Sequence, residues 1–211
     1  MWTLIPIGHK RSGRDISKFL DPASGTRCND CRSPIKKRIG YHERDPQQRK
    51  QFLRLRERFF RRGKRPVHID ECGFASSTAR RYGYAPKGHC VDGLVSGQRR
   101  PRTSLLAARI EGRLEEPLLF AGTCDTAVFN TWLKTRLCPR LTAHHLVIMD
   151  NAAFHKSAET AELINATGAT LLFLPPYSPD FNPIEQDFAA LKKRREYQDQ
   201  ATINEIVKAY Q

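Results

Sequence analysis

The chain lacks the features of membrane and secreted proteins. It has no apolar run of about 18 residues, and Met1–Pro22 lacks the continuous apolar segment of a signal peptide. Its six cysteines follow no regular framework, which favours reduced thiols over a disulfide scaffold. We therefore expect a cytoplasmic protein with no membrane partner.

Two further classes of site are poorly supported. Cys28 and Cys31 form a CxxC, which is typical of half a zinc site or of a redox pair. No second CxxC or HxxxH follows at zinc-finger spacing, so we interpret the pair as a chance occurrence. There is also no recognisable Ser/His or Cys/His arrangement, so we expect no covalent nucleophile.

Acidic residues are scarce in the N-terminal third of the chain. Residues 1–66 hold 19 Lys and Arg against 6 Asp and Glu, whereas residues 67–211 hold 17 against 16. A basic segment joined to a nearly neutral body indicates a polyanionic partner such as a nucleic-acid backbone. The alternative is a solvated or disordered basic segment without a ligand.

Three carboxylates follow predicted elements of structure. Asp70 and Asp150 each end a short apolar strand pattern, and Glu185 lies in the first turn of a predicted helix. A carboxylate just beyond a buried strand faces the crevice where α/β proteins bind ligands. Mg²⁺ takes oxygen ligands and is commonly shared with substrate phosphates, so the three acids predict a divalent-metal site.

Glu185 also has a purely structural interpretation. Asn182 has the character of a helix N-cap, and Pro183 suits the first helical position. Glu185 follows Asn182 by three residues, as in a capping box.

Four segments together resemble the bacterial insertion-sequence transposases of the mariner-like DDE superfamily, of the insertion-sequence 630 type. They are HIDECGF (68–74), RRYGYAPKG (80–88), LVIMDNAAFHKS (146–157) and LLFLPPYSPDFNPIE (171–185). The resemblance covers about Lys36 to the C-terminus. It implies a catalytic triad of Asp70, Asp150 and Glu185, and the 34 residues between the last two fit the family. Two positions depart from it: Cys72 replaces the usual Ser, and Asp187 stands where many members have an aromatic residue, a packing role that we expect Phe188 to take.

The resemblance implies an α/β, ribonuclease-H-like mixed sheet flanked by helices, with a basic N-terminal extension. We expect an irregular or disordered basic extension over residues 1–34, a basic linker with an amphipathic helix over 35–66, and the catalytic domain over 67–211. An antiparallel meander should precede two parallel strands. The predicted strands are Val67–Asp70, Thr103–Ile110, Leu114–Phe120, Leu146–Met149 and Leu171–Leu174, and the predicted helices are Asp45–Arg62, Asp125–Leu137, Ser157–Thr167, Pro183–Arg195 and Thr202–Tyr210.

The implied activity is divalent-metal-dependent cleavage and strand transfer of DNA. Two Mg²⁺ ions, replaceable by Mn²⁺, would be held by the triad, one activating water or a DNA 3′-hydroxyl and the other stabilising the leaving oxygen. The expected partners are transposon terminal inverted repeats, target DNA and a second copy of the chain in a homodimer, in the bacterial nucleoid. Candidate DNA contacts, which could instead be solvated cations, are Arg80, Arg81, Lys87, Arg99, Arg100, Lys192 and Lys193.

Two neighbours of the triad receive supporting roles. We expect Asn151 to orient Asp150, and His155 to have a structural role near it rather than to bind the metal, because magnesium prefers oxygen.

Other functions stay open. The chain begins too late for the helix-turn-helix modules that family members carry, so we expect a truncated copy, and a non-catalytic nucleic-acid-binding or subunit-interaction remnant is the alternative. A ribonuclease-H-like nuclease acting on RNA/DNA hybrids would share the triad.

Overall fold

The computed structural model describes residues 2–6, 41–74, 82–86, 89–90, 102–198 and 201–210. The chain divides into two units, one of Met1–Gly40 and Arg80–Leu94, the other of Tyr41–Ala79 and Val95–Gln211. In the first unit, β1 (Trp2–Pro6) pairs antiparallel with β3 (Tyr82–Pro86). The strand β1 corrects the expectation of irregular structure for these five residues.

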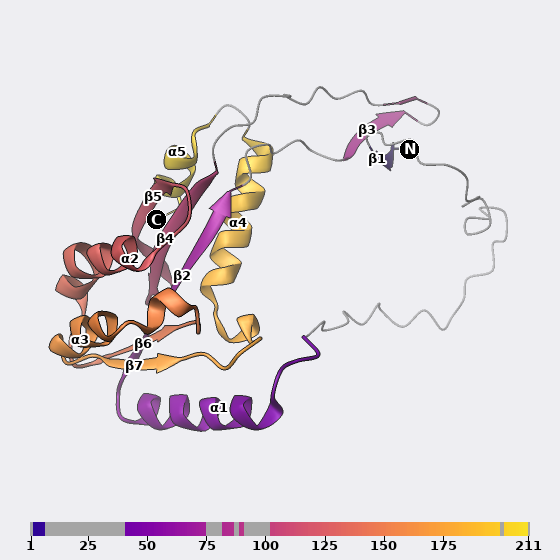
Figure 1. Cartoon of the computed structure of the whole chain (residues 1–211). Helices are drawn as coiled ribbons and strands as arrows, with labels where there is room; N and C mark the ends of the chain where they lie inside the picture. The colour runs from indigo at the N-terminus through magenta and orange to yellow at the C-terminus, as the bar shows by residue number, and fades with distance from the viewer. Residues whose placement is uncertain are drawn as a thin grey trace, which may run out of the picture. The chain divides into compact units, whose positions relative to one another are not determined.

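The second unit is built on a five-stranded mixed sheet in the order β5-β4-β2-β6-β7 (Figure 1). Strands β2, β4 and β5 form the predicted antiparallel meander, and β6-β7 is the predicted parallel pair. Strand β2 also pairs parallel with β6, which was not predicted. The strands are β2 (Arg65–Phe74), β4 (Thr103–Ile110), β5 (Arg113–Ala121), β6 (His145–Met149) and β7 (Thr170–Phe173).

Five α-helices of this unit match the predicted ones within a few residues. Asp45, Asp125 and Ser157 cap the first three through their side chains, as their sequence positions indicate. The helices are α1 (Pro46–Arg61), α2 (Thr126–Trp132), α3 (Ala158–Ala166), α4 (Ile184–Tyr197) and α5 (Ile203–Lys208). Residues Leu133–Leu137 continue α2 as a π-helical turn. Among the described helices, none combines the length and apolarity needed to cross a membrane.

The sheet separates two layers of helices. On one face, Val67, Ile69, Val147 and Met149 pack in one hydrophobic cluster with side chains of α2 and α3. On the other face, Cys72, Phe74, Leu105 and Ala107 pack against α4 and α5. Successive side chains of a strand point to opposite faces, which explains how β2 and β4 contribute to both clusters.

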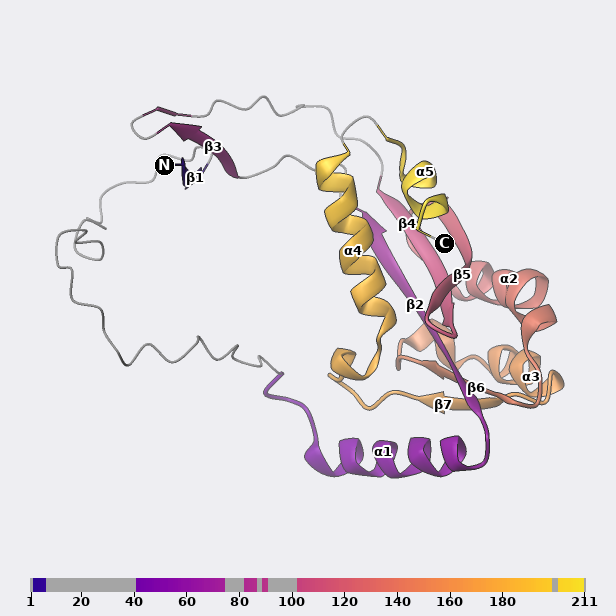
Figure 2. The ribbon, with the colours of Figure 1, turned by 180° about the vertical axis from the view of Figure 1, so that it is seen from behind.

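Helix α1 lies on the same face as α4. Its Phe52 is buried with Leu146 and Ile148, which alternate along β6 with the residues that face α2 and α3. Seen from behind, α1 runs beside β7 and α4 crosses the sheet next to β2 (Figure 2). One face of the sheet therefore carries both the basic helix and the helix of Glu185.

Strand β2 is longer than the sequence predicted. The predicted strand is Val67–Asp70, but β2 continues through Phe74 because β4 pairs with it from Val67 to the end. A side chain at Gly73 would meet the guanidinium of Arg102, which lies over this position. Glycine at position 73 therefore leaves room for the Arg102 side chain to lie against the strand.

The turn between β4 and β5 is shorter than predicted. Glu111 and Gly112 both have positive φ, 50° and 85°, as in the two-residue turns of twisted hairpins. Arg113, which we had placed in the turn, is instead the first residue of β5.

Candidate active site

The parallel pairing of β2 and β6 places two predicted acids side by side. The register runs from Arg65 opposite His145 to His68 opposite Ile148. Asp70 and Asp150 each lie two residues beyond that last pair, on strands about 4.8 Å apart. Asp150 directly follows β6, as predicted, but Asp70 lies inside β2 rather than at its end.

The third predicted acid is held over the same part of the sheet by helix packing. Ile184 and Phe188 are buried against Cys72 and Phe74 of β2, which fixes the first turn of α4. Glu185 lies in that turn and its side chain is exposed. The charges of Glu185 and Asp150 both contribute to raising the pKa of Asp70, so each lies within electrostatic reach of Asp70.

Asp70 has the most perturbed carboxyl of the site. The pKa of Asp70 is raised to about 8, mainly by burial, and the negative charges of Glu71, Glu185 and Asp150 add to the increase. The hydrogen bond from the Glu71 N–H acts in the opposite direction and lowers the pKa. Asp70 is only 9% exposed. A positive charge nearby would offset both the cost of burying the Asp70 carboxylate and its repulsion by the neighbouring acids.

Asn182 contacts Asp70 instead of capping α4. The helix begins at Ile184 after Pro183, with no side-chain hydrogen bond at its N-cap. The Asn182 side chain is buried, and its Nδ2 donates to Asp70 Oδ2 at 2.8 Å. The predicted N-cap and the capping-box interpretation of Glu185 are therefore wrong. The Asn182 side chain is directed to Asp70, and its Oδ1, the atom that would accept from a helix N–H, has no hydrogen-bond partner within the described residues.

His155 is fully buried beside Asp150. Its Nδ1 donates to Asp150 Oδ1 at 2.6 Å, and the Ala152 N–H donates to the same oxygen at 2.9 Å. Burial alone would raise the pKa of Asp150, but these hydrogen bonds and the charges of His155 and Lys156 lower it. Phe129 and Phe154 hold the imidazole, with ring centroids 4.4 and 4.2 Å away.

Asn151 does not orient Asp150 as expected. Its Nδ2 donates to the Leu174 carbonyl, which follows β7. The side chain thus joins the ends of β6 and β7, and the orienting role falls to His155.

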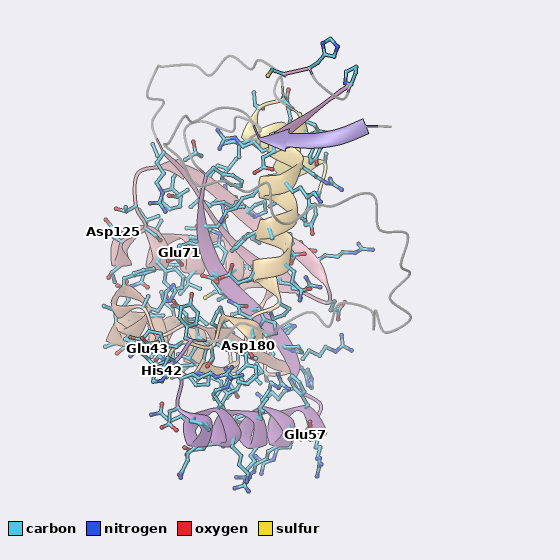
Figure 3. The ribbon with its side chains drawn as sticks, turned by 90° about the vertical axis from the view of Figure 1, so that its right-hand side faces the viewer. His42, Glu43, Glu57, Glu71, Asp125 and Asp180 are labelled. Carbon is cyan, nitrogen blue, oxygen red and sulfur yellow. The ribbon has the colours of Figure 1, made fainter. Side chains whose placement is uncertain are left out.

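Glu71 is a component of the site that sequence reasoning missed. Its Oε2 lies 3.7 Å from His155 Nε2, and neither buried atom has a hydrogen-bond partner within the described part of the chain. Burial raises the pKa of Glu71, with Asp150 and Glu185 adding and His155 opposing. Figure 3 labels Glu71 on β2. The sequence signal that could have identified Glu71 is its place within a strand, between the buried residues Asp70 and Cys72.

The acids do not form a closed metal shell. Among the described residues, no group of three or more His, Cys, Asp or Glu side chains stands in a metal-holding arrangement. The donor set nevertheless fits a hard divalent cation, because it consists of carboxylates on adjacent elements whose mutual repulsion raises the pKa of Asp70.

The predicted DNA contacts are only partly visible. Arg80, Arg81, Lys87, Arg99 and Arg100 lie outside the described residues. Lys192 and Lys193 are exposed on α4, which extends two residues further than predicted, so Arg194 and Arg195 occupy its last turn.

Both departures from the family pattern have a structural explanation. Burial raises the pKa of Cys72 to about 12, and the thiol lies in the cluster beneath α4. Phe188, 1% exposed, fills that cluster as expected. Asp187 points elsewhere and accepts a hydrogen bond from Arg109 Nη1 at 2.5 Å.

Comparisons with known proteins concern the family and the fold of the chain. The model of the DDE superfamily endonuclease family matches residues 65–206. No curated protein sequence matches the chain significantly.

Among solved structures, the chain is similar to a Mos1 transposase paired-end complex with left transposon end, with a TM-score of 0.58, 17% identity, and coverage of 84% of this chain and 63% of that one. The chain is also similar to a Mos1 mariner paired-end complex with Mn, with a TM-score of 0.58, 20% identity, and coverage of 77% of this chain and 53% of that one. For the catalytic domain of Mos1 mariner transposase the TM-score is 0.52 at 14% identity, with coverage of 83% of this chain and 82% of that one. The chain spans less than two thirds of the Mos1 chains in these two paired-end complexes. At these identities the likeness concerns the fold, and it confirms the ribonuclease-H-like architecture.

Proposed function

The chain belongs to the DDE superfamily endonuclease family, and from this we propose that it is the catalytic domain of a transposase that cleaves and transfers DNA strands with a divalent metal ion. The finer assignment is to the bacterial, mariner-like transposases of the insertion-sequence 630 type, which the segments around Asp70, Asp150 and Glu185 resemble.

The observation that carries the proposal is the grouping of these three carboxylates. They come from β2, from the end of β6 and from the first turn of α4, and two of them act on the pKa of the third. Asp70 is buried, and the charges of the other two acids add to the cost of ionising it, so a cation bound there would stabilise the charged form, which supports a metal-binding role.

The carboxylates would hold Mg²⁺ or Mn²⁺, with two ions as the expected number. When bound, such ions supply an activated water or 3′-hydroxyl and stabilise the leaving oxygen of an in-line displacement.

The remaining side chains fix these ligands. Asn182 holds Asp70 from the loop before α4, and His155 holds Asp150 from the 3-10 turn Ala153–Lys156 that follows β6. Hydrogen bonds to ligating carboxylates restrict their rotation and support their affinity for metal. These residues therefore act as positioning residues.

The substrate would be DNA, comprising transposon ends and target DNA, with the chain acting as a homodimer. The Mos1 complexes contain transposon-end DNA, and the net charge of +14 in this chain favours a polyanion.

The test is nicking of supercoiled plasmid DNA in Mn²⁺ by the wild-type chain and by Asp70→Asn, Asp150→Asn and Glu185→Gln. We expect each substitution to reduce nicking at least a hundredfold while the thermal unfolding midpoint shows a folded protein. Glu162→Gln, an exposed acid on α3, is the matched control and should nick normally.

Unchanged nicking by any one of the three site variants would contradict the proposal. An RNA/DNA hybrid offered alongside the plasmid separates the ribonuclease-H-like alternative, since preferential cleavage of the RNA strand would favour that enzyme class.

A further inference from the structure

We infer that the outer face of α1 binds the phosphate backbone of duplex DNA. The surface, called here the α1 ridge, consists of Lys50, Arg54 and Arg58. It deepens the proposed function, on which it rests for its choice of DNA as the polyanion.

The inner face of α1 is fully used by the fold. Arg49 donates to both carboxylate oxygens of Asp180, at 2.9 and 2.6 Å, and its guanidinium lies 3.9 Å from the centre of the Phe181 ring. Phe52 stacks on Phe181 with ring centroids 5.5 Å apart, and Arg56 lies over the Phe52 and Phe60 rings. The cations on this side of the helix therefore have structural partners.

The outer face has none of these contacts. Lys50, Arg54 and Arg58 are exposed, and none forms an ion pair within the described part of the chain. Figure 3 shows side chains of α1 that project away from the sheet, with Glu57 labelled on this helix. Glu57, the only acid of α1, is paired with Arg61 at 3.0 Å.

The spacing of the three cations disfavours the helix itself. They stand at i, i+4 and i+8, where like charges face each other across successive turns and destabilise a helix. The helix dipole favours cations in the last turn, which explains Arg58 and Arg61 but not Lys50 and Arg54. An arrangement that works against folding is expected where a polyanion supplies the compensating charge.

The dimensions of the ridge suit a DNA strand. Eight residues of α-helix rise about 12 Å, and phosphates of one DNA strand follow one another every 3.4 Å or so along the duplex axis. The ridge therefore spans about three to four phosphates.

The contacts of Arg49 also fix the ridge relative to the candidate active site. Asp180 and Phe181 immediately precede Asn182, whose side chain binds Asp70. DNA held on the ridge would thus lie in a fixed relation to the carboxylates.

The experiment measures binding of a labelled 30-base-pair DNA duplex by fluorescence anisotropy over a series of NaCl concentrations, in EDTA so that no cleavage occurs. The ridge variant is Lys50→Gln/Arg54→Gln/Arg58→Gln. The control variant is Arg113→Gln/Lys134→Gln/Lys208→Gln, which removes three exposed cations from β5, the π-helical turn after α2, and α5.

We expect the ridge variant to bind at least tenfold more weakly at 0.1 M NaCl, with a salt slope shallower by about 2 to 3, since each lost phosphate contact removes about 0.9. The control variant should change the slope by less than one. The thermal midpoint of the ridge variant should equal or exceed that of the wild type, because the like-charge contacts are gone.

Equal slopes for the ridge and control variants would overturn the inference, as would a ridge variant that unfolds at a lower temperature. The outcome is independent of catalysis. If the wild type fails to nick plasmid but the ridge variant still has a shallower salt slope for DNA binding, the proposed function alone is refuted. If the wild type nicks normally but the ridge variant has an unchanged salt slope, DNA binding by the α1 ridge alone is refuted.

Discussion

Asn182 and Asp70, 112 residues apart in sequence, meet in a buried hydrogen bond from Nδ2 to Oδ2 at 2.8 Å. The bond joins the loop before α4 to the middle of β2. It explains why Asn182 does not cap α4 and why Glu185, three residues later, remains free of capping contacts. The position of one proposed metal ligand is thereby coupled to that of another.

Asn182→Ala removes this donor and leaves the Asp70 carboxylate less stabilised. We expect the free energy of unfolding to fall by about 1 to 2 kcal/mol and Mn²⁺ to raise the thermal midpoint less than it does in the wild type. Differential scanning fluorimetry with and without Mn²⁺ measures both effects. An unaltered response to Mn²⁺ would show that Asn182 has no role in positioning Asp70.

The raised pKa of Asp70 predicts how stability depends on pH in the metal-free protein. Its pKa is about 8 when folded and has its ordinary value of 3.8 when unfolded, so the folded protein holds an extra proton between these values. The free energy of unfolding should therefore fall as pH rises from about 4 to about 8, with a contribution of at most about 1.4 kcal/mol per pH unit from this group.

Asp70→Asn provides the control for that measurement. Urea denaturation in EDTA at several pH values should give a flatter profile for the variant, which should also be more stable than the wild type near pH 8. A wild-type profile that rises over this interval, or an identical profile for the variant, would contradict the burial of an ionisable Asp70.

His155→Ala removes the hydrogen bond that fixes Asp150. Nicking in Mn²⁺ should fall about 10- to 100-fold, the usual effect of losing a hydrogen-bond partner of a metal ligand. Raising the Mn²⁺ concentration should recover part of the loss in His155→Ala but not in Asp150→Asn. Equal behaviour of the two variants at all Mn²⁺ concentrations would argue against a positioning role.

The network of Arg109, Asp187 and Tyr210 stabilises the packing of α4. Asp187 accepts from Arg109 Nη1 at 2.5 Å and from the Tyr210 hydroxyl at 2.8 Å, and it is only 6% exposed. Asp187→Ala leaves a partly buried cation without its partner, so we expect a loss of about 3 kcal/mol. Tyr210→Phe should cost about 1 kcal/mol. Chemical denaturation measures both, and similar losses for the two variants would contradict this ranking.

Much of the architecture could be predicted because local signals and burial agree. Asp45, Asp125 and Ser157 cap helices as expected, and the apolar run before Asp150 forms a central strand. The strand-helix-strand pattern around Ser157–Thr167 indicates the parallel pairing of β6 with β7. The adjacency of Asp70 and Asp150 depends instead on the pairing of β2 with β6.

The remaining features depend on contacts that local sequence does not encode. Asn182 is a residue type typical of helix caps, but its side chain is directed to the distant Asp70 carboxylate and not to the first N–H groups of α4. Glu71 gave no catalytic signal, and only the fold brings it to His155. The length of β2 is likewise set by its pairing with β4 rather than by its own residues.

The most direct measurement of the central claim is anomalous scattering from crystals soaked in MnCl₂. The account predicts a manganese peak within coordinating distance of the Asp70, Asp150 and Glu185 carboxylates, and its loss in crystals of Asp150→Asn. A peak bound by only one of these three side chains, or manganese found solely elsewhere on the protein, would contradict it.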